Sequence, residues 1–191
     1  MLQQLNDLDR ELFLYLNNLG SARWDTFWLL VTDKWTAIPI YALLLFLIFK
    51  KFGIKGMLIT AVLVAVLITA TDQLANLFKH AFERPRPCRQ EGVMEYSRYI
   101  AERCGRFGYF SAHASNSTGV AVFLGIIFRR YHSRLIWLLL LWALVVSYSR
   151  IYLGVHYPGD ILTGMFIGAV LGYLAALFHR YLMPRFRVPV S

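Results

Sequence analysis

Three ionisable side chains lie close together where two hydrophobic stretches of the sequence meet. They are Arg150, His156 and Asp160, within the stretch 149–160. Pro158 fits the first turn of a helix, where its missing N–H costs nothing, so we expect one helix to end near Arg150 and another to begin at Pro158. His156 then lies in the connection, and Asp160 lies in the first turn of the second helix.

A carboxylate at this spacing can orient the histidine. Asp160 can accept the N–H of one ring nitrogen of His156, which fixes the tautomer and leaves the other nitrogen free to attack or to accept a proton. The alternative is that the two residues only cap a helix at a membrane surface. For an isolated pair, the residue types favour neither interpretation.

The composition indicates a membrane protein. Of the 191 residues, 58% are hydrophobic, which exceeds the share of an ordinary globular domain. The net charge is +9, but the basic residues occur in short segments between apolar stretches, which favours a membrane surface and an anionic substrate over nucleic acid. We predict a single all-α domain over residues 1–191, a polytopic membrane helix bundle.

Apolar segments predict about five transmembrane helices. They comprise residues 36–49, 57–78, 116–128, 135–149 and 159–178. Several are shorter than the roughly 20 residues that a span needs, so flanking polar turns shielded by other helices must complete them. Gly164, Gly168 and Gly172 recur at every fourth position of the last segment, which lets another helix approach closely.

Residues 1–34 are expected to form an interfacial N-terminal region. One face of a helix carries the apolar residues Leu5, Leu8, Leu12, Phe13 and Leu16. Polar and charged residues fill the opposite face, which predicts an amphipathic helix on the membrane, with a lid packed over the bundle as the alternative. Trp24, Trp28 and Trp35 then resemble an interfacial aromatic belt.

Basic residues between the apolar segments predict the orientation. With five helices they lie on one side of the membrane, which the positive-inside rule makes cytoplasmic. They are Lys50, Lys51, Lys55, Arg129, Arg130, Arg134, His179, Arg180, Arg185 and Arg187. The connection 79–116 and the corner at His156 then face the periplasm, and we assign the arginines of that connection to substrate.

Both cysteines lie in the outer connection. An oxidising compartment would let Cys88 and Cys104 form a disulfide. A metal site is disfavoured, because the two are far apart and no histidine lies between them. This cysteine use and the small size favour a bacterial inner membrane.

Two further clusters share the outer face. Residues 79–87 contain two prolines that stiffen the chain while it presents Arg84 and Arg86, and a second polar turn carries Ser111 and His113. A helix start offers N–H groups and a positive dipole end, so Ser111 and the following amides suit a phosphate oxygen. Lysine and arginine can complete an anion site without a metal. Two histidines suggest that one attacks phosphorus and the other protonates the departing oxygen.

The three clusters resemble the signature of the type 2 phosphatidic acid phosphatase (PAP2) superfamily. That signature is a lysine, six residues and Arg-Pro; then Pro-Ser-Gly-His; then Ser-Arg, five residues, a histidine, three residues and an aspartate. Here it reads Lys79 to Arg86-Pro87, Phe110-Ser111-Ala112-His113, and Ser149-Arg150 to His156 to Asp160. The resemblance covers roughly residues 57–178. The second motif departs from it, with phenylalanine for proline and alanine for glycine.

The resemblance implies a role for each matched residue. Cations and the helix start would hold the phosphate: Lys79, Arg86, Arg150, Ser111 and the amide of Ala112. His156 would be the nucleophile that forms a phosphohistidine, Asp160 its orienting partner, and His113 the general acid for the leaving group. No metal or other cofactor is expected.

Two residues outside the motifs have competing interpretations. Asp72 could tune Lys79, but a structural hydrogen bond to a neighbouring helix is the preferred expectation. Arg84 could contact a second phosphate, although a solvated charge is the preferred expectation.

The leading hypothesis is a metal-independent phosphatase for a lipid phosphate or diphosphate. A phosphotransferase would use the same phosphohistidine, and a non-catalytic lipid-binding membrane protein is the third alternative. Undecaprenyl diphosphate is the expected substrate, because outward-facing chemistry fits polyprenyl recycling. Phosphatidylglycerol phosphate, phosphatidic acid and lipid A phosphates are the other candidates. The expected partners are membrane lipids and the lipid phosphate, without nucleic acid, and the sequence does not indicate the oligomeric state.

Overall fold

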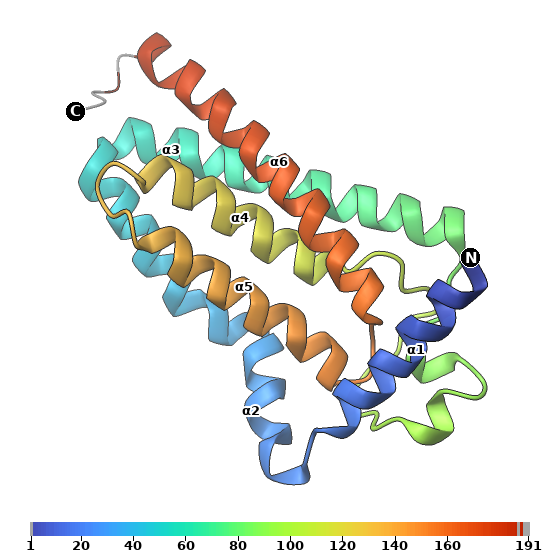
Figure 1. The fold of residues 1–191 in the computed structure, drawn as a ribbon. Helices are drawn as coiled ribbons and strands as arrows, with labels where there is room; N and C mark the ends of the chain where they lie inside the picture. The colour runs from blue at the N-terminus through green and yellow to red at the C-terminus, as the bar shows by residue number, and fades with distance from the viewer. Residues whose placement is uncertain (1, 187, 189–191) are drawn as a thin grey trace.

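The computed structural model describes residues 2–186 and 188. Over these residues the chain forms six α-helices (Figure 1), and the predicted all-α fold is confirmed. They are α1 (Leu2–Asn18), α2 (Ala22–Thr32), α3 (Lys34–Phe82), α4 (Ala112–Phe128), α5 (Leu135–Tyr152) and α6 (Pro158–Arg185). Two 3-10 turns, η1 (Pro87–Arg89) and η2 (Met94–Tyr96), lie in the connection between α3 and α4. Arg187, one of the basic residues used to predict orientation, lies outside the described residues.

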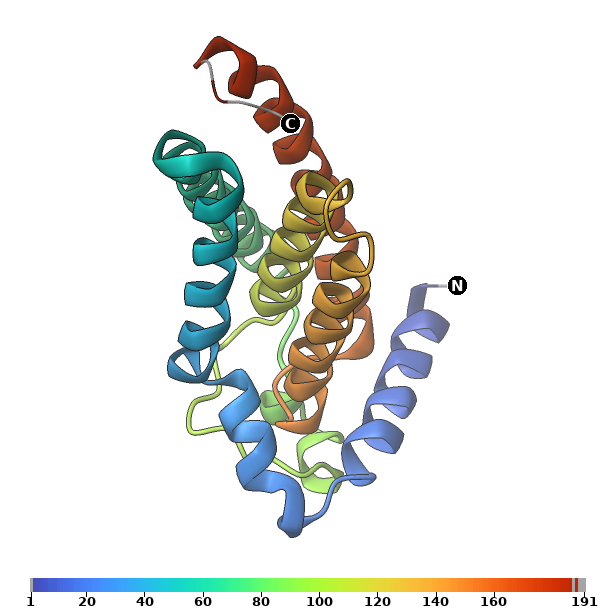
Figure 2. The ribbon, with the colours of Figure 1, turned by 90° about the vertical axis from the view of Figure 1, so that its left-hand side faces the viewer.

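α3 is interrupted at Gly53. The backbone there has φ 66° and ψ −173°, which is not helical and which glycine adopts without a Cβ penalty. The helix doubles back at this point (Figures 1 and 2), so that Leu44 and Ile48 of its first arm share a core with Leu63 and Leu67 of its second. The two arms contain the first two predicted apolar segments.

Three of the described helices are long and apolar enough to cross a membrane, namely α3, α5 and α6. α4 is apolar but has only 17 residues. It begins at Ala112, four residues before the predicted segment 116–128, because Ser111 caps its first turn. His113 therefore lies on a helix and not in the polar turn before it.

α6 lies directly against α4 along its glycines. A Cβ on Gly168 would come within 2.2 Å of the carbonyl oxygen of Ser115, and Cβ atoms on Gly164 and Gly172 would be nearly as close to the backbone of the same neighbouring segment. The prediction that these glycines allow close helix packing is confirmed. The contact fixes the start of α4 against the start of α6, where the predicted site residues lie.

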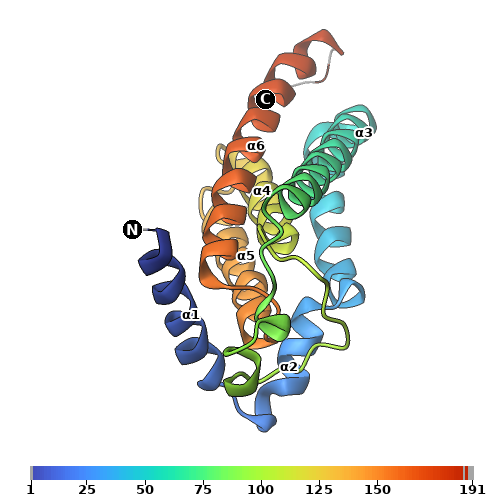
Figure 3. The same cartoon turned by 90° about the vertical axis from the view of Figure 1, so that its right-hand side faces the viewer.

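α1 packs against the bundle. Figure 3 shows it beside the ends of α5 and α6 that flank the corner at His156. Phe13 and Asn17 are fully buried, whereas Leu5, Leu8 and Leu12 are exposed. The residues of the predicted apolar face therefore do not all have the same environment. Phe13 packs against the bundle, as the lid alternative predicts, whereas the exposed leucines form the face that would meet lipid.

The tryptophan-rich segment and the outer connection complete this end of the molecule. Trp24 and Trp35 are exposed, as an interfacial belt requires, but Trp28 stacks on Tyr152 of α5. The predicted disulfide between Cys88 and Cys104 is present.

Candidate active site

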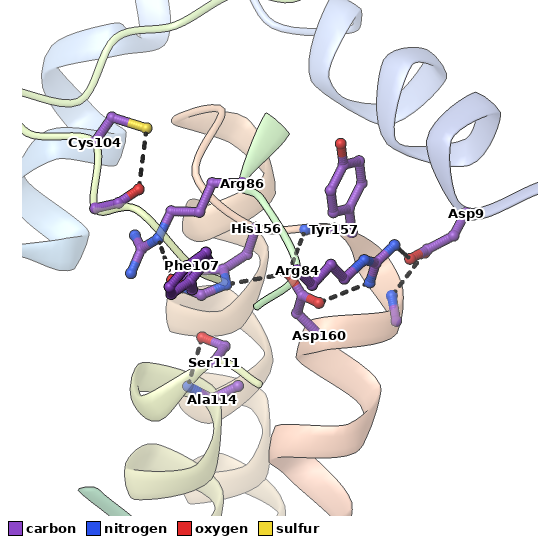
Figure 4. Close-up of polar contacts among 12 residues, drawn as sticks. Asp9, Arg84, Arg86, Cys104, Phe107, Ser111, Ala114, His156, Tyr157 and Asp160 are labelled. Carbon is purple, nitrogen blue, oxygen red and sulfur yellow. Dashed lines mark hydrogen bonds and ion pairs between the residues drawn. The ribbon is translucent and has the colours of Figure 1, made fainter. Parts of the chain in front are cut away.

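The corner between α5 and α6 buries the predicted histidine and aspartate. His156 is 2% exposed and Asp160 is fully buried. α5 ends at Tyr152 and α6 begins at Pro158, close to the boundaries that the proline predicts. The side chain of Asp160 reaches back to accept the Tyr157 N–H at 3.1 Å, and its Oδ2 lies 3.3 Å from His156 Nδ1 (Figure 4). The Asp160 carboxylate therefore both caps the start of α6 and orients the histidine.

His156 is held in its neutral form. Burial lowers its pKa to about 4, and the positive charges of Arg86 and Arg150 act in the same direction, whereas the hydrogen bond to Asp160 and the negative charge of Asp160 act in the opposite direction. A neutral imidazole carries one proton, which we assign to Nδ1 because a carboxylate oxygen faces it. Nε2 then has a free lone pair, as a nucleophile requires.

The three cations among the predicted phosphate ligands lie close enough for their charges to interact, and two of them, Arg86 and Arg150, also act on this histidine. The charge of Lys79, near the end of α3, interacts with those of Arg86 and Arg150. Arg86 donates from Nε to the carbonyl oxygen of Phe107 at 2.9 Å. Within residues 2–186, the buried Nε of Arg150 has no hydrogen-bond partner. Cations held close to one another, with donors left unused, form a site that an anion would stabilise.

Arg150 is also held by Thr32, which belongs to none of the sequence motifs. Its Nη1 donates to Oγ1 of Thr32, at the end of α2. No local pattern indicated this contact, because the two residues are 118 positions apart.

The start of α4 supplies the remaining predicted residues. Ser111 is fully buried; its Oγ accepts the Ala114 N–H at 3.4 Å, and its own N–H donates to the carbonyl oxygen of Asp160 at 3.0 Å. Its amide is therefore used within the protein, so the donors at this helix start that an anion could still use are the Ser111 hydroxyl and the first-turn amide of Ala112. The His113 side chain is exposed, and its charge interacts with those of His156 and the site cations.

Comparison with known proteins identifies this arrangement. The PAP2 superfamily profile matches residues 55–184, a range that contains all three clusters. The chain belongs to the PAP2 superfamily. It is 39% identical over 180 residues to the lipid A 4'-phosphatase of Bacteroides thetaiotaomicron, covering 91% of this chain and 78% of that protein. It is 35% identical over 189 residues to the lipid A 4'-phosphatase of Porphyromonas gingivalis, covering 96% and 78%.

A solved structure has the same fold. The crystal structure of a transmembrane PAP2 type phosphatidylglycerolphosphate phosphatase from Bacillus subtilis superposes with a TM-score of 0.74 at 18% identity, covering 93% of this chain and 87% of that one. With the family match and the relatives, the protein is a membrane enzyme, a lipid phosphate phosphatase of the PAP2 type.

Arg84 of this PAP2 protein has a different environment from either sequence interpretation. Its Nη1 donates to Asp160 Oδ1 at 2.7 Å and its Nη2 donates to Asp9 Oδ2 at 2.6 Å. Figure 4 shows the guanidinium between the two carboxylates, and it also lies 4.3 Å from the centre of the Tyr157 ring. Arg84 is therefore neither a solvated charge nor a ligand of a second phosphate, because both terminal nitrogens of its guanidinium already donate to carboxylates.

Asp72 forms the expected contact with a neighbouring helix. Its Oδ1 accepts the side-chain N–H of Asn116 on α4 at 2.9 Å, which confirms the preferred interpretation. Its charge also interacts with that of Lys79. The hydrogen bond thus fixes a carboxylate close to one of the site cations.

A cavity of about 480 Å³ opens beside Arg150. The end of α2 and its connection to α3 form one wall, and the outer connection forms the other. Its lining mixes polar and apolar groups, among them Thr26, Leu30, Trp35, Glu102 and Arg103. This volume could hold a headgroup larger than the phosphate itself.

Proposed function

We propose that this PAP2 enzyme removes the 4'-phosphate from lipid A at the periplasmic face of a bacterial inner membrane, through a phosphohistidine at His156. The observation that carries the chemistry is the buried, neutral His156, with Nδ1 against Asp160 and three cations around it.

The first half-reaction uses each group in one role. Lys79, Arg86 and Arg150 bind the phosphate oxygens and stabilise the charge that develops on them. Nε2 of His156 attacks phosphorus, and the bond from phosphorus to the lipid oxygen breaks. His113, exposed at the site, donates a proton to that oxygen as it leaves.

The second half-reaction reverses the proton transfer. Water gives a proton to His113 and attacks the phosphohistidine, the N–P bond breaks, and inorganic phosphate leaves with neutral His156 restored. Asp160 orients the imidazole in both steps and stabilises positive charge on the ring. Cations from side chains supply the electrostatic stabilisation throughout, so we propose catalysis without a metal.

Two observations favour lipid A over undecaprenyl diphosphate, the substrate expected from the sequence. The two relatives at 39% and 35% identity are lipid A 4'-phosphatases. In addition, the cavity beside Arg150 has polar lining residues, among them Thr26, Glu102 and Arg103, next to apolar ones such as Leu30 and Trp35. The polar groups could bind the hydroxyls of a sugar that carries the phosphate, and a polyprenyl chain has no such hydroxyls.

The fold supports five membrane crossings. The two arms of α3, together with α4, α5 and α6, would each cross once. The basic residues lie at the turn within α3, between α4 and α5, and at the end of α6, which are at one end of the bundle in Figure 1, opposite the site. We assign that end to the cytoplasm, which puts the disulfide and the site in the oxidising periplasm.

Phosphate release from the detergent-purified protein tests the function. The substrates are lipid A bearing a phosphate at the 4' or the 1 position, undecaprenyl diphosphate, phosphatidylglycerol phosphate and phosphatidic acid, all with EDTA present. We expect the highest kcat/KM with the 4'-phosphate and no turnover by His156→Ala. A higher kcat/KM with undecaprenyl diphosphate would overturn the substrate assignment, and inhibition by EDTA would overturn the metal-free chemistry.

His113→Ala separates the roles of the two histidines. It should retain turnover only with a good leaving group such as p-nitrophenol, because such a group needs no proton. Equal residual turnover of His113→Ala and His156→Ala on lipid A would contradict the assigned roles. Transfer of labelled phosphate to an added alcohol, in place of its release, would instead favour the phosphotransferase.

A further inference from the structure

Two carboxylates share the guanidinium of Arg84, and only one of them belongs to the PAP2 motifs. Asp160 accepts from Nη1 at 2.7 Å, and Asp9 of α1 accepts from Nη2 at 2.6 Å. The side chains of Asp9, Arg84 and Asp160 are 15%, 19% and 0% exposed. Little water competes with these ion pairs, so the position of each group depends on the others.

Asp9 also holds the start of α6. Its Oδ1 accepts the Gly159 N–H at 2.7 Å. Gly159 permits this approach, because a Cβ there would lie 2.8 Å from Asp9 Oδ2. One carboxylate thus fixes both Arg84 and the residue before Asp160.

α1 is anchored on both sides of the corner at His156. Asn17 donates to the carbonyl oxygens of Ile151 and Tyr152, at 3.0 Å each, where α5 ends. The Phe13 ring packs edge-to-face on Tyr157, with ring centres 5.4 Å apart. Contacts of α1 therefore reach the residues on either side of His156, and Asp9 is linked to Asp160 through Arg84, with which both carboxylates form ion pairs.

We propose that Asp9 is a positioning residue for the PAP2 reaction, acting through Arg84 and Asp160 on His156. The Nδ1 to Oδ2 distance of 3.3 Å is long for a hydrogen bond to a carboxylate, so this pair alone does not fix the angle of the imidazole. Arg84 sets the plane of the Asp160 carboxylate, and Asp9 holds Arg84 from the opposite side. The N-terminal helix thereby forms part of the catalytic apparatus. This inference rests on the proposed roles of His156 and Asp160.

Asp9→Asn is the test variant, because it keeps an oxygen for the Gly159 N–H and removes the charge that pairs with Arg84. Asp7→Asn is the matched control, since it makes the same change on the same helix. Asp7 is 57% exposed, and its only ion pair among the described residues is to Arg10 at 3.8 Å. Both variants are assayed for kcat and KM with the best wild-type substrate, after thermal unfolding has established the folded fraction.

We expect Asp9→Asn to lower kcat per folded molecule roughly tenfold to a hundredfold, the usual range for loss of an outer hydrogen-bond partner at a buried site. KM should stay within about twofold, because the three phosphate-binding cations are unchanged. Asp9→Glu should recover part of kcat, and Asp7→Asn should match the wild type. A normal kcat per folded molecule for Asp9→Asn, even with a lower unfolding temperature, would overturn the proposal and leave Asp9 a structural anchor.

A double variant asks whether Asp9 acts through Asp160. If it does, Asp9→Asn should lower kcat by less than about twofold once Asp160→Asn is present, because the pathway is already broken. If the two substitutions instead lowered kcat independently, so that their fold losses multiplied, the proposed pathway would be wrong. An inactive wild type would instead refute the proposed function, whereas an active wild type with an equally active Asp9→Asn would refute only the role of Asp9.

Discussion

Acidification should destabilise the fold through His156. The side chain is 2% exposed, and its pKa falls from the ordinary 6.5 to about 4, chiefly because burial disfavours the charged ring. Between these two pH values the unfolded chain binds a proton that the folded chain does not bind. The free energy of unfolding must therefore decrease as the pH falls through this interval.

The size of the effect follows from the two pKa values. At about 1.4 kcal/mol per pH unit, the interval between 6.5 and about 4 corresponds to a loss of about 3 kcal/mol near pH 4. This is a large fraction of the stability of a typical domain, which is about 5–15 kcal/mol. It is large enough to measure against a reference variant.

His156→Asn provides that reference, because it does not titrate and is otherwise similar in size. The free energy of unfolding of both proteins is measured in mixed micelles, by SDS titration with tryptophan fluorescence, from pH 7 to pH 4. Groups that do not contact His156 titrate alike in both proteins and cancel in the difference, whereas Asp160, 3.3 Å from His156, titrates with it as one pair. We expect the wild type to lose about 3 kcal/mol more than the variant over this range.

Parallel pH dependences would refute the argument, since they would mean that His156 has the same pKa in the folded and unfolded states. A wild type that gained stability over the variant on acidification would mean that the imidazolium is the favoured form in the fold. The second result would also remove the basis for a neutral nucleophile at physiological pH, because the pKa of His156 would then lie above its ordinary 6.5.

Three further predictions follow from particular contacts. Gly168→Ala should lower kcat about a hundredfold in the phosphate-release assay. The added Cβ would lie 2.2 Å from the Ser115 carbonyl oxygen and push α4 away from α6 by about 1 Å. An unchanged kcat would show that the helices adjust without moving the site. Thr32→Val should lower kcat/KM about tenfold, because Arg150 loses a hydrogen-bond acceptor that holds it at the phosphate; an unchanged kcat/KM would contradict this. Replacing Cys88 and Cys104 by serine should reduce the free energy of unfolding by about 3 kcal/mol, since the two are 16 positions apart; stability equal to that of the wild type would show that the loop is held without the bond.

The types and spacing of neighbouring residues were enough to predict several features of the helices that carry the site. Pro158 predicted the start of α6, because a residue without an N–H is tolerated in the first turn of a helix. The glycines of α6 predicted close helix packing, because four-residue spacing leaves one face without side chains. Spacing along the chain also placed Asp160 one turn from His156, and the structure has this contact.

The break at Gly53 was not predicted as such. The sequence indicated two apolar segments with lysines between them, and the structure continues helix on both sides of one residue. A single non-helical residue leaves the hydrophobic pattern almost unchanged, so periodicity could not locate the turn.

Only the tertiary structure shows which residues position the catalytic groups. Asp9 and Arg84 are 75 positions apart, and Arg84 and Asp160 are 76 apart. On the sequence, Asp9 is one of several charges on an amphipathic helix, and residue type cannot distinguish the charge that is buried from those that meet solvent. The sequence by itself determined which side chains could bind and attack a phosphate, because local spacing fixes their geometry. Only the packing of α1 against the α5–α6 corner decided which other charges orient them, because such a contact depends on where distant helices meet.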